Sequence, residues 1–438
     1  MEIRKMKKIA CSVLMALMAI AAMAQSGTNS PYSQYGLGQL SEQTSGFNRG
    51  MNGLGYGFRE HNQVNFLNPA SYASIDSLTF IFDAGISGYI TNFKEGGKSK
   101  NAQNANFEYA VAAFKVGKRI GLSFGILPYT NVGYNYSNTQ TLYDNLYGTK
   151  TTTTNLYSGS GGLHQVYLGA GWMPFKGFAI GANLSYLWGD YERSITNSYS
   201  DANVNTLSKI YTATVNNYKL DFGVQYTAKM SKHDELTIGL TYGLGHKLNA
   251  DPMCKIISTN SQTAVSDTTT YTVDNGLAVP ATFGAGFVWN RENRLKLGVD
   301  YSLQKWASVE FPYYSVVNER PTYQLTDKAF TDRHKLTVGG DYCPRERGNK
   351  FFQRVHYRFG VSYATPYLRI NGQDGPKEMS VSAGVGVPIM NKWNSRSMLN
   401  VSAQWVRQDA KSLLTENTFR INIGLTFNER WFAKWKVE

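Results

Sequence analysis

From residue 78 onward, apolar and polar positions alternate with the period of a β-strand. The first alternating segment, "LTFIFDAGISGYIT" at 78–91, places most of its apolar residues on one face. Similar segments follow, among them "RIGLSFGIL", "FAIGANLSYLW", "YKLDFGVQY" and, near the end, "FRINIGLTF". Alternating segments of about ten residues are the signature of a membrane β-barrel. The pattern predicts an all-β fold, an antiparallel transmembrane β-barrel of about 14 strands.

The opposite face of these segments is small and polar, as Gly121, Ser123 and Gly125 illustrate. A soluble sandwich would turn charged side chains to water on that face. Glycine, serine and asparagine instead suit a lumen that is crowded by another part of the chain, while the apolar face meets lipid.

The connections alternate between tight turns, such as Gly117–Arg119, and long polar stretches, such as residues 131–156 and 191–215. Outer-membrane barrels have short periplasmic turns and long outer loops, and an even strand count puts both ends in the periplasm. Cys254 then falls in an outer loop and Cys343 on the periplasmic side. The two thiols are therefore expected to be too far apart for a disulfide.

The first 24 residues have a basic start, an apolar run and the small-x-small end Ala22-Met23-Ala24, which predicts a secretory signal peptide. No later segment has the roughly 20 apolar residues of a membrane helix. We therefore predict three parts: a signal peptide (1–24), an N-terminal plug or hatch (25–77) and a transmembrane β-barrel (78–438). Such a porin-like, multi-pass barrel belongs in the outer membrane of a Gram-negative cell, in contact with outer-membrane lipid and lipopolysaccharide.

The predicted plug centres on residues 50–76, "GMNGLGYGFREHNQVNFLNPASYASID", which are rich in glycine and do not alternate. Asn68 suits a helix N-cap and Pro69 the first helical position, so Asn68, Pro69 and Ala70 predict a turn into one helical turn. The glycines would let this backbone pass close to the small residues of the wall. Because a barrel this wide leaves a channel unless it is filled, we predict that the segment folds inside the lumen.

Pro128 interrupts the segment "GILPYTNVGY". Proline cannot donate a hydrogen bond to a β-ladder, so it is normally kept from strand interiors. One interpretation is that Gly125 to Pro128 kink the strand and open the wall sideways. The other is that Pro128 lies at the outer end of its strand, where a loop begins.

The formal charge is +13. Without the predicted signal peptide, which holds four of the 44 basic and one of the 31 acidic residues, it is 40 − 30 = +10. These charges are scattered, so we predict no nucleic-acid partner. One basic cluster falls on the lumen-facing parity: Lys296, Arg333, Lys335, Arg354 and Arg358. It could attract an anionic head group, or form salt bridges with Asp300, Asp341 and Glu60, which is the favoured interpretation.

Motifs for catalysis are weak. "GLSFG" at 121–125 matches the nucleophile pattern Gly-x-Ser-x-Gly, but Ser123 sits in mid-strand, without the required strand-turn-helix context. The six histidines show neither metal-binding spacing nor a cysteine pair. The sequence therefore predicts no enzyme, no metal site and no cofactor.

The stretch "GMNGLGYGFREHNQVNFLNPASYASID" resembles the hatch of the FadL-like family, outer-membrane transporters of long-chain fatty acids and aromatic hydrocarbons. The start "NSPYSQYGLGQL" and the end "RWFAKWKVE" resemble members from the Bacteroidota. The resemblance implies a fourteen-strand barrel, a plug that contains Asn68, Pro69 and Ala70, and a lateral opening in the wall. Two departures are that no carboxylate clamp aligns and that the chain ends in Glu438, not in an aromatic residue.

Three functions are compatible with these patterns. A surface lipase would need a serine and a histidine adjacent at the lipid boundary, and the other two functions are favoured. The first of these two is an outer-membrane channel that takes up a small hydrophobic ligand, fatty-acid-like or aromatic, and releases it sideways. The alternative is an outer-membrane barrel that serves as a protein-binding adaptor of a secretion system. An apolar path to a gap in the wall would favour transport, whereas long outer segments rich in tyrosine and threonine would favour the adaptor.

Overall fold

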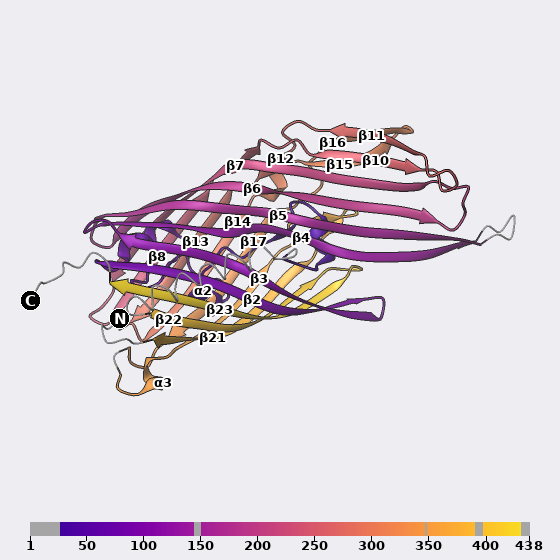
Figure 1. Ribbon diagram of the computed structural model, residues 1–438. Helices are drawn as coiled ribbons and strands as arrows, with labels where there is room; N and C mark the ends of the chain where they lie inside the picture. The colour runs from indigo at the N-terminus through magenta and orange to yellow at the C-terminus, as the bar shows by residue number, and fades with distance from the viewer. Residues whose placement is uncertain (1–26, 144–149, 347, 390–396, 431–438) are drawn as a thin grey trace, which may run out of the picture.

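The computed structural model describes residues 27–143, 150–346, 348–389 and 397–430. The predicted signal peptide and the C-terminal Glu438 lie outside these ranges. The main sheet has seventeen strands, and removing β1, β10 and β11, which attach to its outer part, leaves fourteen. These fourteen strands form a closed antiparallel barrel, because the last strand, β23, pairs with the first, β2 (Figure 1). The predicted fold class is confirmed.

The wall strands follow one another in chain order. They are β2 (Thr79–Glu95), β3 (Lys98–Lys115), β4 (Ile120–Tyr143), β5 (Lys150–Phe175), β6 (Phe178–Tyr199), β7 (Thr206–Lys229), β8 (Asp234–Gly243), β13 (Thr282–Arg291), β14 (Leu295–Gln304), β17 (Arg333–Tyr342), β18 (His356–Ala364), β21 (Lys377–Ile389), β22 (Ser397–Asp409) and β23 (Thr415–Arg430).

The remaining elements are short. They are η1 (Pro31–Gln34), β1 (Gln39–Leu40), α2 (Gly46–Arg49), η2 (Pro69–Ser74), β9 (His246–Leu248), β10 (Met253–Thr259), β11 (Ser266–Thr272), β12 (Leu277–Val279), η3 (Trp306–Ser308), β15 (Phe311–Val317), β16 (Arg320–Thr326), α3 (Phe351–Arg354), β19 (Arg369–Ile370) and β20 (Gln373–Asp374). Within the described ranges, no helix has the length and apolar character needed to cross a bilayer.

The alternation in sequence becomes the two faces of the wall. In β18, Phe359 and Val361 are exposed on the outside, whereas Arg358, Gly360 and Ser362 are buried on the inside. In a transmembrane barrel the outer face contacts lipid, so exposed apolar side chains are stable there. The predicted parity is confirmed.

One side of the barrel is much taller than the other (Figure 1). Strands β4, β5, β6 and β7 have 24, 26, 22 and 24 residues, whereas β8 and β13 have ten each. About 9–11 residues suffice to cross the membrane. The loops predicted at 131–156 and 191–215 were wrong over their described residues, because most of these are strand. Outside the membrane both faces of a strand can be polar, so the alternation that reveals a strand disappears.

These extensions form a six-stranded outer sheet, which we define as residues 130–143, 150–162, 189–199 and 206–216 together with β10 and β11. β10 pairs with β7 on one side and β11 on the other. Where this sheet leaves the regular barrel, Gly162 and Gly189 have φ of +146° and +143°. A Cβ on either would lie within 2.4 Å of a backbone oxygen, so only glycine fits there.

Both cysteines of the described chain are free and buried. Cys254 lies in β10 of the outer sheet, and Cys343 follows β17 at the opposite end of the barrel. The expectation that no disulfide joins them is confirmed.

Candidate functional site: a filled lumen and a parted wall

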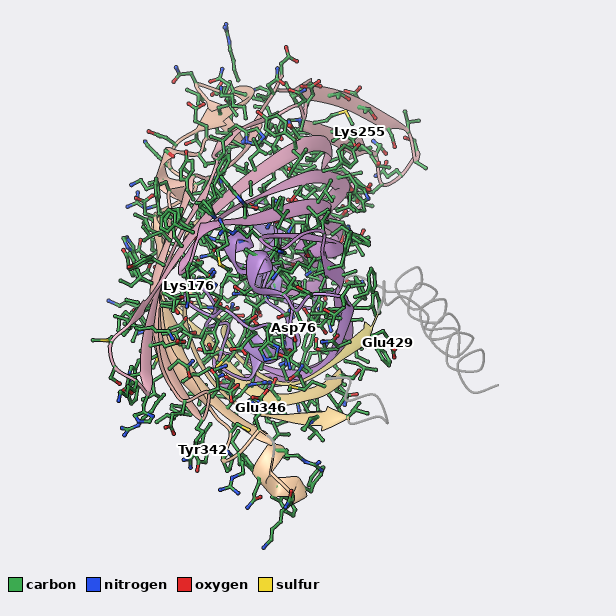
Figure 2. The ribbon with its side chains drawn as sticks, turned by 90° about the vertical axis from the view of Figure 1, so that its left-hand side faces the viewer. Asp76, Lys176, Lys255, Tyr342, Glu346 and Glu429 are labelled. Carbon is green, nitrogen blue, oxygen red and sulfur yellow. The ribbon has the colours of Figure 1, made fainter. Side chains whose placement is uncertain are left out.

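The N-terminal segment, residues 27–76, lies inside the ring of strands (Figure 2). Its helix η2 packs against β4, β5, β6 and β7, and α2 packs against β21, β22 and β23 on the other side. Phe47, Leu54 and Tyr72 are almost completely buried. The segment therefore fills the lumen between opposite walls, as a plug would.

The predicted Asn-Pro-Ala turn is present. The Asn68 side-chain oxygen accepts a hydrogen bond from the Ala70 backbone N–H at 3.2 Å, and Pro69 begins η2. The Asn68 amide nitrogen donates to the carbonyl oxygens of Tyr56, at 2.9 Å, and Val224, at 3.3 Å. This one buried side chain therefore caps the helix and ties two parts of the plug to β7.

Glycines in the wall let the plug backbone approach. A Cβ added to Gly121 would lie 1.9 Å from the carbonyl oxygen of Tyr72, and one added to Gly239 would lie 1.9 Å from that of Tyr56. A Cβ added to Gly181 would lie 2.4 Å from the carbonyl carbon of Pro69. The small residues on the inner face therefore leave the space that the plug backbone occupies.

A buried ion-pair network anchors the plug. The Arg49 guanidinium lies 2.9 Å from the Glu108 carboxylate of β3 and 4.0 Å from that of Glu42. Burial would raise the pKa of the Glu42 carboxyl, but the charges of Lys335, Arg49 and Arg420 outweigh it and lower the pKa to about 2. Glu42 therefore stays ionised inside the lumen.

This shift predicts an acid dependence of stability. The Glu42 pKa is lowered from 4.5 to about 2, so its stabilising contribution is complete above about pH 4.5 and is lost as the pH falls through 2. We expect Glu42→Gln to melt at a lower temperature at pH 7, but to lose less stability than the parent between pH 4.5 and 2. Thermal melting in detergent measures this, and equal losses in both proteins would contradict it.

The predicted basic cluster is divided between two levels. Towards the periplasmic end, the Lys296 ammonium lies 2.5 Å from Glu60, and Arg358 lies 3.0 Å from Asp341. Towards the outer end, Arg333 lies 3.4 Å from Glu378. These contacts agree with the salt-bridge interpretation for Glu60 and Asp341, whereas Asp300 accepts hydrogen bonds from the Gly55 and Tyr56 backbone N–H groups.

The placement of Arg354 in a lumen strand was wrong. Arg354 is the last residue of α3, in the turn that precedes β18. Because Arg354 belongs to this helical turn and not to a strand, the alternation of the strand does not determine which way its side chain faces.

Two cavities flank the plug. The one on the outer side has about 210 Å³, and its lining includes Glu42, Glu108, Lys335 and Arg420. The one on the periplasmic side has about 690 Å³, and its lining includes Arg59, Glu60, Lys115, Glu235 and Lys296. Such charged walls hold water or polar groups more readily than a hydrocarbon.

The hydrogen-bonded pairing of the wall is interrupted between β3 and β4, which leaves a parting there. Their pairing ends at Ala110 and Ile126, and beyond that point β3 pairs only with β2 and β4 mainly with β5. Pro128 lies inside β4, opposite His164, and the register shifts directly after it. The interpretation that Pro128 ends its strand was wrong, because the outer sheet prolongs β4 to Tyr143.

The N-terminal segment occupies this parting. In β1, Gln39 and Leu40 pair with Asn131 and Thr130 of β4. On the other side, the carbonyl oxygen of Gly27 accepts a hydrogen bond at 2.6 Å from Asn106 of β3. Sequence reasoning missed this role. The only signal was "NSPYSQYG", where Ser30 caps and Pro31 begins η1.

The outer mouth is closed by a buried apolar cluster. Tyr32 and Leu37 of the N-terminal segment meet Leu163 of β5, Trp306 of η3 and Phe330 in this cluster. The Trp306 side chain is 1 % exposed and lies 5.2 Å from the Phe330 ring, centre to centre. The chain's own side chains therefore pack together at the outer end of the lumen.

Comparison with known proteins adds a family. A family model described as BamG matches residues 5–438, almost the whole chain. The chain belongs to the BamG family. A search of curated proteins finds no match.

Among solved structures, this BamG-family barrel is similar to the CymD monoaromatic hydrocarbon channel, with 13% identity over 91% of this chain and 100% of that one and a TM-score of 0.57. It is also similar to the Ralstonia pickettii toluene transporter TbuX, with 14% identity, 88% and 98% coverage and a TM-score of 0.58. A Pseudomonas aeruginosa FadL homologue gives 13% identity, 89% and 99% coverage and 0.59.

At such identities the likeness is one of fold. The FadL-like barrel architecture predicted from the sequence is confirmed as a fold. These solved neighbours are channels and transporters. In the BamG-family chain, Ser123 is a lumen-facing residue of β4 whose hydroxyl lies 2.8 Å from that of Tyr167.

Proposed function

We propose that this barrel binds a partner protein at the outer face of the membrane, as an adaptor of a secretion system does, and that its outer sheet supplies the docking edge. The observation that carries the proposal is β11, the last strand of that sheet. Among the described strands it pairs only with β10. Six of its seven residues are exposed.

β11 also contacts β16, and its Tyr271 ring lies 6.2 Å from the Tyr314 ring of β15, but its second edge has no strand partner among the described residues and can accept a further strand. Its unpaired backbone N–H and C=O groups form a template, and proteins that avoid such pairing place lysine, proline or inward charges on their edges. β11 reads "SDTTTYT", with Asp267 as its single charged residue and no proline. The edge therefore suits an extended segment of a partner that adds to the sheet by backbone hydrogen bonds.

The interior supports the same function. An apolar path to a wall gap was the feature that would favour transport. Charged side chains stand among the apolar ones in the lining of both cavities beside the plug, and Leu37, Trp306 and Phe330 pack together at the outer end of the lumen. Loops rich in tyrosine and threonine were expected of the adaptor; the described outer residues form strands instead, and these strands offer a sheet with threonine and tyrosine along them.

Mutations on the edge test the proposal. We expect Thr268→Lys with Thr270→Lys to reduce the partner protein retained by the barrel at least tenfold, because edge lysines oppose strand addition. The measurement is quantitative mass spectrometry of proteins that copurify with the tagged barrel from its own outer membrane. Ala202→Lys, on an exposed outer turn, is the matched control. Equal retention in all three proteins would contradict docking at β11.

A second candidate is the uptake of small hydrophobic molecules with lateral release. The parting between β3 and β4 favours it, and the solved neighbours include channels for toluene and other monoaromatic hydrocarbons. For release through this gap, β1 must break its pairing with Asn131 and Thr130 of β4.

A cross-link distinguishes the two candidates. Gln39→Cys and Asn131→Cys, which are paired residues of β1 and β4, would lock the N-terminal segment in the gap. Toluene uptake into proteoliposomes is then measured with the disulfide oxidised and reduced. The docking proposal expects no difference, whereas lateral release expects uptake only in the reduced form.

A further inference from the structure

The turn between β17 and β18 projects away from the barrel. It carries α3, which lies outside the ring of strands at the periplasmic end, near Tyr342 (Figures 1 and 2). Most other periplasmic turns are tight. Only four residues connect β7, which ends at Lys229, to β8, which begins at Asp234, and the Met230 N–H donates to the Asp234 carbonyl. The α3 turn therefore lies beside the wall, where the membrane surface is.

Its exposed face is aromatic. The side chains of Phe351 and Phe352 are 48% and 73% exposed, in contact edge to face. Tyr357 at the start of β18 is exposed as well, and its hydroxyl lies 3.4 Å from the Phe352 carbonyl oxygen. Phe359 follows on the same outer face of β18. The aromatic patch is thus continuous with the lipid-facing surface of the wall.

Backbone hydrogen bonds hold the patch in this position. The Arg345 N–H donates to the Gln353 carbonyl at 2.8 Å, and the Gly348 N–H donates to the Arg345 carbonyl at 2.9 Å. The Cys343 N–H donates to the Arg294 carbonyl in the neighbouring turn, at 2.8 Å. The described backbone of this turn therefore holds the two phenylalanines in place, and their apolar surface needs a cover.

Positive charge flanks the aromatic patch. Arg345 and Lys350 are exposed on the same turn. The nearby Glu346 carboxylate lies 3.8 Å from His61 of the plug and is 42% exposed, so it lies towards the lumen and offsets only part of this positive charge. Aromatic side chains at the level of the head groups, together with basic side chains, are the arrangement with which proteins hold an anionic membrane surface.

We propose that the α3 turn is a phospholipid-binding site of the periplasmic leaflet, in which Phe351 and Phe352 enter the interface and Arg345 and Lys350 bind anionic phosphate head groups. A lipid occupant follows from continuity with the lipid-facing wall and from charge. The site fixes the height and tilt of the barrel in the membrane, on the side opposite to the outer sheet.

The test places a fluorescent label on the turn without changing the four residues. Asn349→Cys, in a chain with Cys254→Ser and Cys343→Ser, is labelled and reconstituted in nanodiscs of phosphatidylethanolamine, with and without phosphatidylglycerol. Lipids with a head-group nitroxide then quench the label. We expect at least fivefold more quenching than for the same label at Ala202→Cys on the outer side, and more with phosphatidylglycerol than without.

Charge reversal completes the test. Arg345→Glu with Lys350→Glu is expected to abolish the effect of phosphatidylglycerol, whereas Lys411→Glu on the outer side leaves it unchanged. Quenching by aqueous iodide but not by lipid nitroxides would overturn the proposal. It would mean that the patch faces water and binds a periplasmic protein instead. Lipid quenching that is the same with and without phosphatidylglycerol would overturn the head-group site. Gel mobility before and after heating verifies that each variant is folded.

Discussion

Replacing Gly239 with valine is expected to displace the plug from the lumen. A Cβ at this position would lie 1.9 Å from the Tyr56 carbonyl oxygen and 3.1 Å from the Asn68 amide nitrogen. Overpacking of a core usually costs about 1–3 kcal/mol, and here backbone is the obstacle, so we expect a loss of about 3 kcal/mol or more. The plug would become accessible, and trypsin would cut after Arg49, which is 1% exposed in the native fold.

The matched control is Gly88→Val. Gly88 is also a strand glycine, but it faces outward, and nothing lies within 4 Å of a Cβ placed there. We expect its melting temperature and trypsin resistance to equal those of the parent. Trypsin resistance in both variants would show that the plug does not depend on close contact with the wall.

Removing the charge of Arg49 is expected to have an effect of similar size. Arg49→Met leaves the carboxylates of Glu108 and Glu42 in a buried site without the guanidinium that lies 2.9 Å from one and 4.0 Å from the other. Breaking one partner of a buried ion pair costs about 3–5 kcal/mol. Chemical unfolding followed by tryptophan fluorescence measures the loss.

The control for charge alone is Arg407→Met. Arg407 lies 3.7 Å from Asp409, but its side chain is 46% exposed, and exposed pairs contribute about 0–1 kcal/mol. In addition, Glu108→Gln should restore part of the stability of Arg49→Met, because the buried charge disappears with it. Equal losses for Arg49→Met and Arg407→Met would contradict an anchoring role of the buried network.

The barrel could be predicted because its two faces differ in chemistry. Phe359 and Val361 face lipid while Gly360 and Ser362 face the plug, so a period of two is visible in the sequence. The plug could be inferred from the same contrast, since wall residues as small as Gly239 leave room for it. Asn68 and Pro69 also carry a local signal, because capping depends on neighbours in sequence.

The outer sheet could not be predicted in this way. Above the membrane, the threonines at 151–154 meet polar surroundings on both sides, so no alternation distinguishes strand from loop. The interruption of the wall between β3 and β4 could not be predicted for another reason. Where β3 leaves β4 is decided by pairing partners, and the segment that fills the gap comes from around residue 39, far away in sequence.

The most direct test of the central claim is mass spectrometry of the barrel purified in mild detergent from its own outer membrane, with small molecules and retained proteins determined in the same sample. The docking account predicts a partner protein in stoichiometric amount and no enriched hydrophobic compound. A specific hydrophobic compound that copurifies in stoichiometric amount, without any protein partner, would contradict it.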